Sequence, residues 1–447
     1  MKTHSIYAEA VRALVIMALA LAGTACSTYD PDFIIYPQGQ RQGTDIERTA
    51  SSGARNAFII YSLGFNNLSG YLKEDINDIA SGELPSHFKS DDLLLVFSHN
   101  TNGSYTVNTS PVLTRIYKDR QGDVVRDTVL VLPKGTLSAS TATMNKVLTY
   151  IKEEYPAKHY GMLLSSHGTG WLPAGYANSP SSFESRSMAY RRSATMVPVP
   201  YQEKEQADGM PMVKSFGCQN VSSSSTYEMD INDMADAIPM KLDYMIFDAC
   251  FMGGIEVAYE FRDVCDRMVF SQTEILADGM DYKTMTTYLL KEEPDLEGFC
   301  RNYFEHYNNL EGAYKSATIS LVDCTALEPL AEVCGTLFDE LRGGITALQD
   351  NTSAVQRYYR SEYPNFRWFF DIESIISNAG ADAFQTAGLR EALDGCILYK
   401  AATENFMNSF AIRNHSGLSM YLPYTGREYL NSFYKELEWN KATGLVE

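Results

Sequence analysis

The feature that most constrains this chain is an alternation, from residue 58 onward, of short β-rich apolar runs with helical stretches. The runs predict strands at residues 57–61, 93–98, 112–117, 160–165, 243–247, 268–271 and 316–322. Between them, segments such as 141–154 and 231–238 carry apolar residues at a spacing that is typical of helices with one buried face. The sequence therefore predicts an α/β fold, with a mostly parallel sheet covered by helices on both faces.

The composition predicts how 447 residues are divided. We expect one domain over residues 55–322 and a mainly helical, aromatic-rich second domain over 323–447, with its clearest helical stretches at 366–376 and 383–398. Residues 171–227 lack sustained periodicity and hold five prolines, so we expect a long loop there, of a length that is usually functional or disordered. We expect its basic residues to be exposed: Arg186, Arg191, Arg192, Lys204 and Lys214.

The amino-terminal residues have the pattern of an export signal. Lys2 and Arg12 precede the apolar run 13–22, which is too short to span a bilayer. Residues 21–26, Leu-Ala-Gly-Thr-Ala-Cys, resemble a bacterial lipoprotein signal, so we expect a leader over 1–25, a lipidated Cys26 and a tether over 26–54. The expected location is the cell envelope or surface, anchored to a membrane. Simple secretion with a free Cys26 is the alternative.

Charge and cysteine spacing exclude several classes of protein. Lys and Arg number 37 against 56 Asp and Glu, and the net charge of −19 repels phosphate backbones, so we expect no nucleic-acid partner. Seven cysteines follow Cys26, without CxxC or Cys/His spacing, so neither a metal site nor a redox pair is predicted. Apart from Cys250, these cysteines are expected to be core residues or to form disulfides.

Two predicted strands end in reactive side chains, at the edge where open α/β sheets gather their active sites. One strand leads into His167 and Gly168, and the other leads into Cys250 shortly before Gly254. A thiol attacks as a thiolate, which the helix expected near Gly254 and the imidazole of His167 could both promote. The backbone N–H groups of Gly168 and Cys250 could bind the developing oxyanion.

Each of these residues also has a plainer interpretation. Cys250 could be a small buried hydrophobe, and His167 could be a polar group at the surface. His99 also follows an apolar strand and is the second candidate for the base, although no glycine directly follows it. The sequence does not identify a third residue that would orient the base.

Five segments of the chain together resemble a known peptidase family. They are residues 166–171 (SHGTGW), 247–254 (FDACFMGG), 271–274 (SQTE), 278–282 (DGMDY) and 417–423 (GLSMYLP). The order and separation of these segments resemble the clostripain family of cysteine endopeptidases, which has a caspase-like fold. The resemblance implies hydrolysis of peptide bonds after Arg or Lys through a thioester on Cys250, with His167 as general base and then acid.

The resemblance also implies which acids bind the basic side chain of the substrate. Asp248 matches the acidic position two residues before the family's cysteine, and Asp278 matches an acid in a later turn. On an extended segment Asp248 and Cys250 point to the same side, and a carboxylate in a partly dry pocket selects a cation. Asp248 could instead cap a helix and Asp278 could be a turn residue. Met280 and Gln272 depart from the family pattern, so the detailed side-chain preference stays open.

The family is commonly made as zymogens that cut themselves after a basic residue between the histidine and the cysteine. The candidates here are Lys214, Arg191 and Arg192, in that order, because Lys214 lies nearest to the resumption of regular structure. Calcium dependence occurs in part of the family, but no loop here has an EF-hand pattern. We therefore expect chemistry without a cofactor or metal, with calcium kept only as an optional structural or activating ion.

Two other functions stay open at this point. A caspase-like surface lipoprotein could act as a silent binding or adhesion module, with aromatic residues, 12% of the chain, supplying contacts. A cysteine hydrolase of another amide or ester would form a thioester with a small acyl substrate and leave peptides ending in Arg or Lys intact. The presence of both His167 and Cys250 favours an enzyme, because a decayed enzyme usually loses one of the pair.

Overall fold

The structure is a computed structural model that describes residues 34–35, 54–87, 90–103, 108–185, 199–200, 210–214, 219–222, 225–360 and 367–447. The predicted leader and the lipidation site Cys26 lie outside the described residues, as do Arg191 and Arg192. Lys214, the first candidate for self-processing, lies within them.

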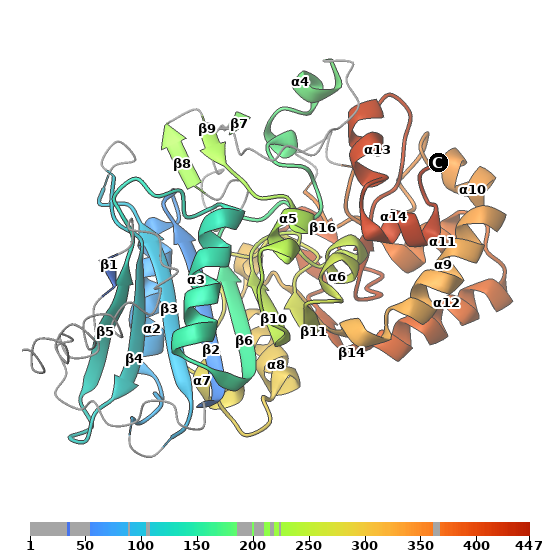
Figure 1. Ribbon diagram of the computed structural model, residues 1–447. Coiled ribbons are helices and arrows are strands. Elements are labelled where there is room, and N and C mark those ends of the chain that lie inside the picture. Colours follow the sequence, from blue (N-terminus) through green and yellow to red (C-terminus); the bar gives the residue numbers. More distant parts are fainter. Residues whose placement is uncertain are drawn as a thin grey trace, which may run out of the picture.

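A ten-stranded mixed sheet organises the described residues, in the order β1-β5-β4-β3-β2-β6-β10-β11-β12-β14 (Figure 1). The strands are β1 Ile34–Ile35, β2 Ala54–Gly64, β3 Leu93–Asn100, β4 Val112–Lys118, β5 Val124–Val131, β6 Ala157–Ser165, β10 Leu242–Asp248, β11 Cys265–Phe270, β12 Thr318–Asp323 and β14 Ile397–Ala402. The five central strands, from β3 to β11 in this order, run parallel, and the outer strands pair antiparallel. The mostly parallel α/β sheet predicted from the sequence is confirmed.

The edges of the sheet differ from a simple strand-helix alternation. The strands predicted at 112–117 and 316–322 are present as β4 and β12, but both are antiparallel to their inner neighbours. Strand β5 was not predicted, because its alternating polar residues leave it half exposed. It follows β4 through a tight turn in which Gly122 has a φ of 90°, so the two strands form a hairpin.

Helices cover both faces of the sheet, and the alternation of side chains along β2 decides which core each residue enters. Ala57, Ile59 and Tyr61 pack in the core that contains α3 (Thr141–Glu154), α5 (Ile231–Asp236) and α6 (Ile255–Phe261). Phe58 and Ile60 face the opposite core. That core contains residues of α2 (Ser69–Ser81), α7 (Met285–Leu289) and α8 (Leu296–Asn308).

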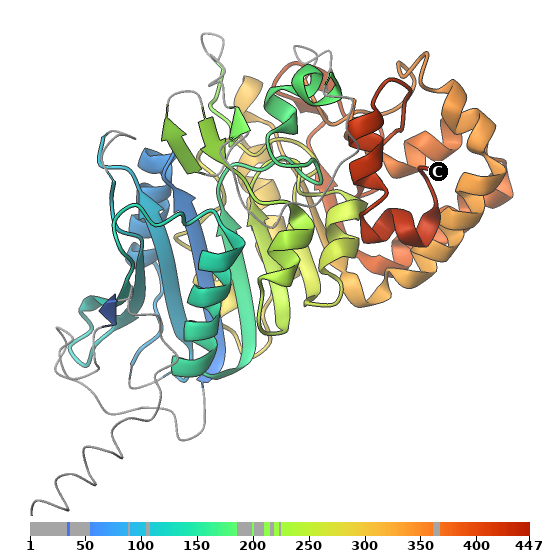
Figure 2. The same ribbon diagram turned by 45° about the horizontal axis from the view of Figure 1, so that its top comes forward.

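Beyond β12 the chain is mainly helical and gathers at one end of the molecule, coloured orange to red in Figures 1 and 2. Its elements are η4 Cys324–Ala326, α9 Glu328–Glu340, α10 Arg342–Ala347, β13 Phe370–Asp371, α11 Ile372–Asn378, α12 Ala383–Cys396, β15 Asn405–Phe406, β16 Phe410–Ala411, β17 Ser419–Met420, α13 Glu428–Tyr434 and α14 Glu438–Thr443. Strand β14 returns to the edge of the main sheet. A domain boundary at residue 322 stays a prediction.

The segment expected to be one irregular loop contains short elements. They are the 3-10 helix η2 Tyr176–Asn178, α4 Pro180–Glu184, β7 Val199–Pro200, β8 Gln219–Ser222 and β9 Ser225–Tyr227. The three strands form a small sheet at the top of Figures 1 and 2, near the end of β2, where the Asn220 N–H donates to the Phe65 carbonyl oxygen at 2.9 Å. The expectation of no regular structure over 171–227 was therefore wrong in part, because these short strands pair with one another rather than carrying a periodic apolar face.

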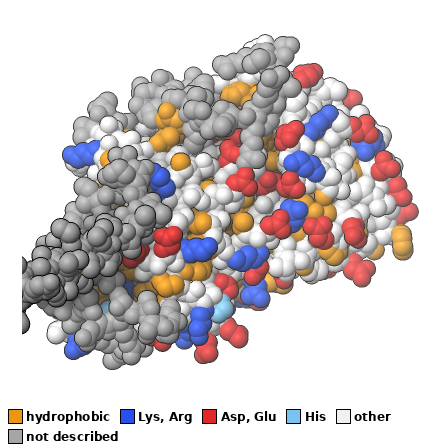
Figure 3. Space-filling view, in the orientation of Figure 1, with side chains coloured by type: hydrophobic (Ala, Val, Ile, Leu, Met, Phe, Trp, Pro, Cys, Tyr) orange, Lys and Arg blue, Asp and Glu red, His pale blue; other side chains and the backbone are white. Residues whose placement is uncertain are grey.

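The described cysteines are unpaired, and both signs of charge occur on the surface. The six cysteines within the described ranges are free and buried, so they are core residues and not disulfides there. On the face seen in Figure 3, basic and acidic side chains are intermixed, and Asp and Glu are frequent over the C-terminal helices. None of the described helices is long and apolar enough to span a membrane.

Candidate active site

The register between β6 and β10 brings the two candidate catalytic residues to the same height. The strands are parallel neighbours in which Ser165 pairs with Asp248, and His167 and Cys250 each follow two residues later. Gly168 allows the two loops to touch, because a Cβ at this position would lie 2.5 Å from the carbonyl oxygen of Cys250 and 3.1 Å from its nitrogen. The backbone proposed as the oxyanion site, Gly168 and Cys250, is therefore contiguous.

Cys250 is fully buried in a turn that carries an unusual backbone conformation. Its sulfur accepts a hydrogen bond from the Ile275 N–H at 3.1 Å. Burial raises the pKa of the thiol well above its ordinary value, and the charge of Glu274 raises it further. The next residue, Phe251, has a φ of 61°, which is costly for a non-glycine residue, and its ring stacks on Phe369 with centroids 4.6 Å apart. A side chain from the C-terminal region thus holds the cysteine turn.

His167 is also buried, and it is oriented by a residue that the sequence analysis did not identify. Its Nε2 donates a hydrogen bond to Asn67 Oδ1 at 2.6 Å. Burial lowers the pKa of His167 to about 3. Asn67 comes shortly after β2, at the same edge of the sheet. The pair of asparagines after a predicted strand was the signal available in the sequence.

An acidic pocket lies beside this pair, and a lysine of the same chain fills it. Asp248 is fully buried and accepts hydrogen bonds from Ser165 Oγ at 3.0 Å and from the Tyr282 hydroxyl at 2.7 Å. The ammonium of Lys214 donates a short hydrogen bond to the same carboxylate. Asp75, on α2, adds a second carboxylate, 3.8 Å from the Lys214 nitrogen. The sequence analysis did not single out Asp75.

Lys214 belongs to an extended segment that pairs with the chain after Cys250. The expectation that Lys214 is exposed was wrong: its side chain is fully buried, because two carboxylates and a serine hydroxyl surround its charge. Two backbone hydrogen bonds bind the segment to its neighbour: the Lys214 N–H to the Ile275 oxygen at 2.9 Å and the Ala277 N–H to the Met212 oxygen at 2.8 Å. Together they make an isolated antiparallel bridge between Val213 and Leu276.

Two further candidates lie apart from this cluster. Asp278 is exposed, in a turn before Gly279, and within the described chain its side chain makes no hydrogen bond or ion pair with Lys214. His99 lies near the carboxyl end of β3. In the sheet, β2 and β6 lie between β3 and β10. Its Nδ1 hydrogen-bonds to Ser138 Oγ at 2.7 Å, and burial lowers its pKa to about 4. The strand order therefore brings His167, and not His99, beside Cys250.

A buried ion pair borders the cysteine turn. Arg360 donates two hydrogen bonds to Glu274, at 2.6 and 2.9 Å, and the side chains are 4% and 0% exposed. Glu274 directly precedes Ile275, whose backbone holds the sulfur of Cys250. The C-terminal region therefore fixes the nucleophile through charge as well as through the aromatic stack.

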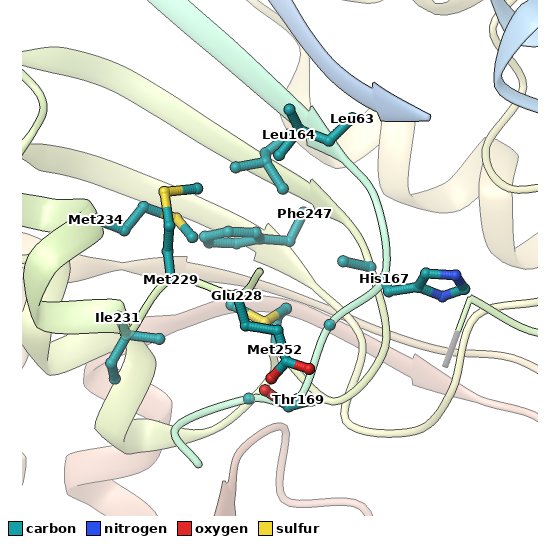
Figure 4. A pocket seen from close by; sticks show the side chains of 13 residues that line it. Leu63, Leu164, His167, Thr169, Glu228, Met229, Ile231, Met234, Phe247 and Met252 are labelled. Atoms are coloured by element: carbon teal, nitrogen blue, oxygen red, sulfur yellow. The ribbon is translucent and has the colours of Figure 1, made fainter. Parts of the chain in front are cut away.

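A small apolar pocket lies behind the histidine loop (Figure 4). Its labelled side chains include Leu63, Leu164, Met229, Met234, Phe247 and Met252, together with Glu228. The imidazole of His167 points away from these apolar groups in Figure 4. Glu228 accepts a hydrogen bond from the Gly175 N–H at 2.8 Å, and burial raises its pKa to about 7. This apolar pocket is lined by the loop that carries His167, and Asp248 of the acidic pocket is not among its lining residues.

No group of three or more His, Cys, Asp or Glu side chains that could hold a metal ion occurs in the described part of the chain. The site brings together a thiol, an imidazole, backbone N–H groups and buried carboxylates. A thiol beside an imidazole and backbone N–H donors are the elements of a cysteine peptidase.

Comparison with known proteins agrees with this class. A solved structure of an inactive zymogen C11 protease from Parabacteroides distasonis is 26% identical, with a TM-score of 0.67 over 88% of this chain and 99% of that chain. A secreted C11 cysteine protease from Bacteroides thetaiotaomicron, iotapain, shares the fold, with 23% identity, the same coverage and a TM-score of 0.66. A structure of a secreted C11 cysteine protease from the same organism with an irreversible peptide inhibitor also shares it, with 20% identity and a TM-score of 0.66. The search of curated proteins finds no match.

The family model described as the clostripain family matches residues 60–193 and 204–444. The chain belongs to the clostripain family, and it is a cysteine endopeptidase with the caspase-like fold.

Proposed function

We propose that this endopeptidase cleaves after lysine or arginine with a Cys250–His167 dyad, and that it is a zymogen that cuts itself after Lys214. The observation that carries the proposal is the position of Lys214, whose ammonium fills the Asp248 pocket while its backbone pairs with the chain beside Cys250. A basic side chain in an acidic pocket is the arrangement expected of the residue before a scissile bond.

The path of residues 212–214 supports this assignment. An extended peptide that adds a strand to a protease is held by main-chain hydrogen bonds, while its alternate side chains enter pockets. Here the main-chain hydrogen bonds are present and the Lys214 side chain enters the acidic pocket, whereas burial does not alternate along the segment, because Val213 is buried and Met212 is 37% exposed. The backbone of Lys214 raises the pKa of His167 and its charge lowers it, so Lys214 lies close to the catalytic base. The segment therefore binds as a substrate would.

The chemistry follows from these positions. His167 takes the proton of the Cys250 thiol, and the sulfur attacks the carbonyl carbon of the basic residue. The N–H groups of Gly168 and Cys250 stabilise the oxyanion, and His167 then protonates the departing amine as a thioester forms. His167 next removes a proton from water, which attacks the thioester, and the thiol recovers its proton as the acid product leaves. Asn67 keeps the imidazole in the required orientation.

The intact chain has the properties of a resting form. Burial raises the pKa of the Cys250 thiol and lowers that of His167 to about 3, so both groups are neutral while Lys214 fills the site. Departure of the segment after cleavage would let water reach the dyad and make the ion pair easier to form. We further propose that side chains and water suffice for the chemistry, without a cofactor, and that calcium, where it acts, is a structural or activating ion.

We also propose that the chain is exported and lipidated at Cys26. Strand β1 starts at Ile34, eight residues later, and pairs with β5. An extended chain of eight residues spans at most about 26–29 Å, so a lipid on Cys26 would hold the body close to the membrane. Labelling with a fatty-acid analogue, compared between wild type and Cys26→Ala, tests this anchor.

The decisive test of the proposed function uses matched fluorogenic peptides that end in Arg, Lys, Asp or Leu. We expect the wild-type protein to hydrolyse the Arg and Lys peptides alone and Cys250→Ala to hydrolyse none. Asp248→Asn should lose most activity on both basic peptides, because it removes the buried charge of the pocket. Cleavage of the Leu peptide with equal efficiency would overturn the specificity. A folded wild type that cleaves no peptide, with Cys250 inert to an acyl probe, would favour the binding module.

A further inference from the structure

Asp75 is an acidic residue on the buried face of helix α2. Along α2, the buried positions include Leu72, Asp75 and Ile79, so the spacing that puts two apolar residues into the core puts an acid there too. Asp75 is only 7% exposed. A buried charge is costly unless a cation offsets it, so its position calls for a partner.

The partner in this chain is the lysine that fills the substrate pocket. Asp75 Oδ2 lies 3.8 Å from the Lys214 nitrogen, and among the described residues no hydrogen-bond donor reaches that oxygen. Burial raises the pKa of Asp75, the charge of Lys214 lowers it, and the charge of Asp248 raises it. An ionised Asp75 is therefore favoured by a positive charge at the position of the Lys214 nitrogen.

We propose that Asp75 determines specificity by making this pocket select lysine over arginine, an inference that rests on the proposed function. An ammonium concentrates its charge and three donors at one atom. Around the Lys214 nitrogen, Asp248 Oδ2 and Ser165 Oγ accept hydrogen bonds, the latter at 3.2 Å, and Asp75 Oδ2 adds a second carboxylate charge at 3.8 Å. The site thus matches a point charge with two carboxylates.

A guanidinium would use the same pocket differently. Its planar fork pairs with both oxygens of one carboxylate, and Asp248 Oδ1 has no hydrogen-bond partner within the described chain. An arginine bound to both oxygens of Asp248 would direct its donors there rather than at Asp75. The end of the pocket is also close: a Cβ on Gly279 would lie 2.8 Å from the Lys214 nitrogen, so a longer side chain must displace this turn. Asp248 serves either cation, whereas Asp75 favours lysine.

Self-processing provides the first test, because the chain carries its own substrate. Four full-length proteins form a cycle: wild type, Lys214→Arg, Asp75→Asn and the double variant. We expect Lys214→Arg to slow cleavage about tenfold in the wild-type background and less than threefold in the Asp75→Asn background. Equal slowing in both backgrounds would overturn the role of Asp75.

Matched peptides ending in Lys or Arg provide the second test, on the processed enzymes. We expect kcat/KM of the wild type to favour Lys about tenfold, and Asp75→Asn to remove that preference while it keeps activity on Arg. Glu74→Gln, which removes a charge from the exposed side of the same helix, is the control and should leave the ratio unchanged.

The outcomes separate the inference from the proposed function. If Asp75→Asn still cleaves after Arg, the variant is folded. If it does not, the unfolding midpoints of Asp75→Asn and Asp75→Ala show whether folding has failed. A folded variant that loses both activities equally, or neither, overturns the inference alone. A wild type that cleaves neither peptide overturns the proposed function.

Discussion

The ion pair between Arg360 and Glu274 gives the sharpest test of how the C-terminal region supports catalysis. The pair is bidentate and nearly fully buried, so Arg360→Met would leave an uncompensated charge on Glu274. Breaking a buried pair in this way costs about 3–5 kcal/mol, whereas removing both partners costs much less. We expect Arg360→Met and Glu274→Gln each to lower the free energy of unfolding by that amount. The double variant Glu274→Gln/Arg360→Met should recover part of the lost stability.

The two single variants should move the reactivity of Cys250 in opposite directions. The charge of Glu274 raises the pKa of the thiol, and that of Arg360 lowers it. Arg360→Met should therefore shift the alkylation of Cys250 in the processed enzyme to higher pH, and Glu274→Gln should shift it to lower pH. Denaturant unfolding and alkylation rates with iodoacetamide between pH 5 and 10, a range chosen around the ordinary thiol pKa of about 8.5, measure both effects.

A matched control separates this effect from general loss of charge. Arg301 forms an exposed pair with Glu297 on α8, so Arg301→Met should change neither unfolding nor alkylation. Shifts of the alkylation profile in the same direction for Arg360→Met and Glu274→Gln would refute the electrostatic reasoning, even if both variants were destabilised.

Three further outcomes follow from individual contacts. Burial raises the pKa of Glu256 from 4.5 to about 7. The protonated side chain therefore contributes fully to stability below pH 4.5, and roughly 3 kcal/mol of the free energy of unfolding is lost as the pH rises through 7. Urea unfolding of Glu256→Gln should lack this loss. Phe369→Leu removes the ring that stacks on Phe251, and we expect a loss of about 1–3 kcal/mol in unfolding together with slower turnover. Asn67→Ala should lower kcat at least roughly tenfold with little change in KM, because His167 loses its orientation; an unchanged kcat would contradict this role.

The central sheet could be predicted because its signals are local. Each buried parallel strand is a continuous apolar run bounded by polar turns, and the sequences of β6 and β10 show this pattern. The direction of β4 and the existence of β5 depend on a hairpin with an exposed edge, where alternating polarity hides the strand. Pairing direction at the sheet edges is a tertiary property, so composition along one segment does not determine it.

The site was predictable to the extent that its residues sit on strand ends. His167 and Cys250 follow two adjacent strands by the same number of residues, which the sequence could indicate. Asp75 and Asn67 come from α2 and the turn before it, about a hundred residues or more earlier, and only the packing of this region against β6 and β10 brings them to the site. Lys214 was recognised by its place in the loop, but its burial depends on charge pairing that no local pattern encodes.

Self-processing after Lys214 is tested most directly by the intact mass and amino-terminal sequence of the purified protein. We expect the wild type to convert to two fragments, with Ser215 at the new amino terminus, and Cys250→Ala and Lys214→Ala to stay single chains. Lys241→Ala, which alters an exposed lysine, should convert like the wild type. Cleavage at another bond in the wild type, or fragments that start at Ser215 in Cys250→Ala, would contradict a zymogen that opens its own site after Lys214.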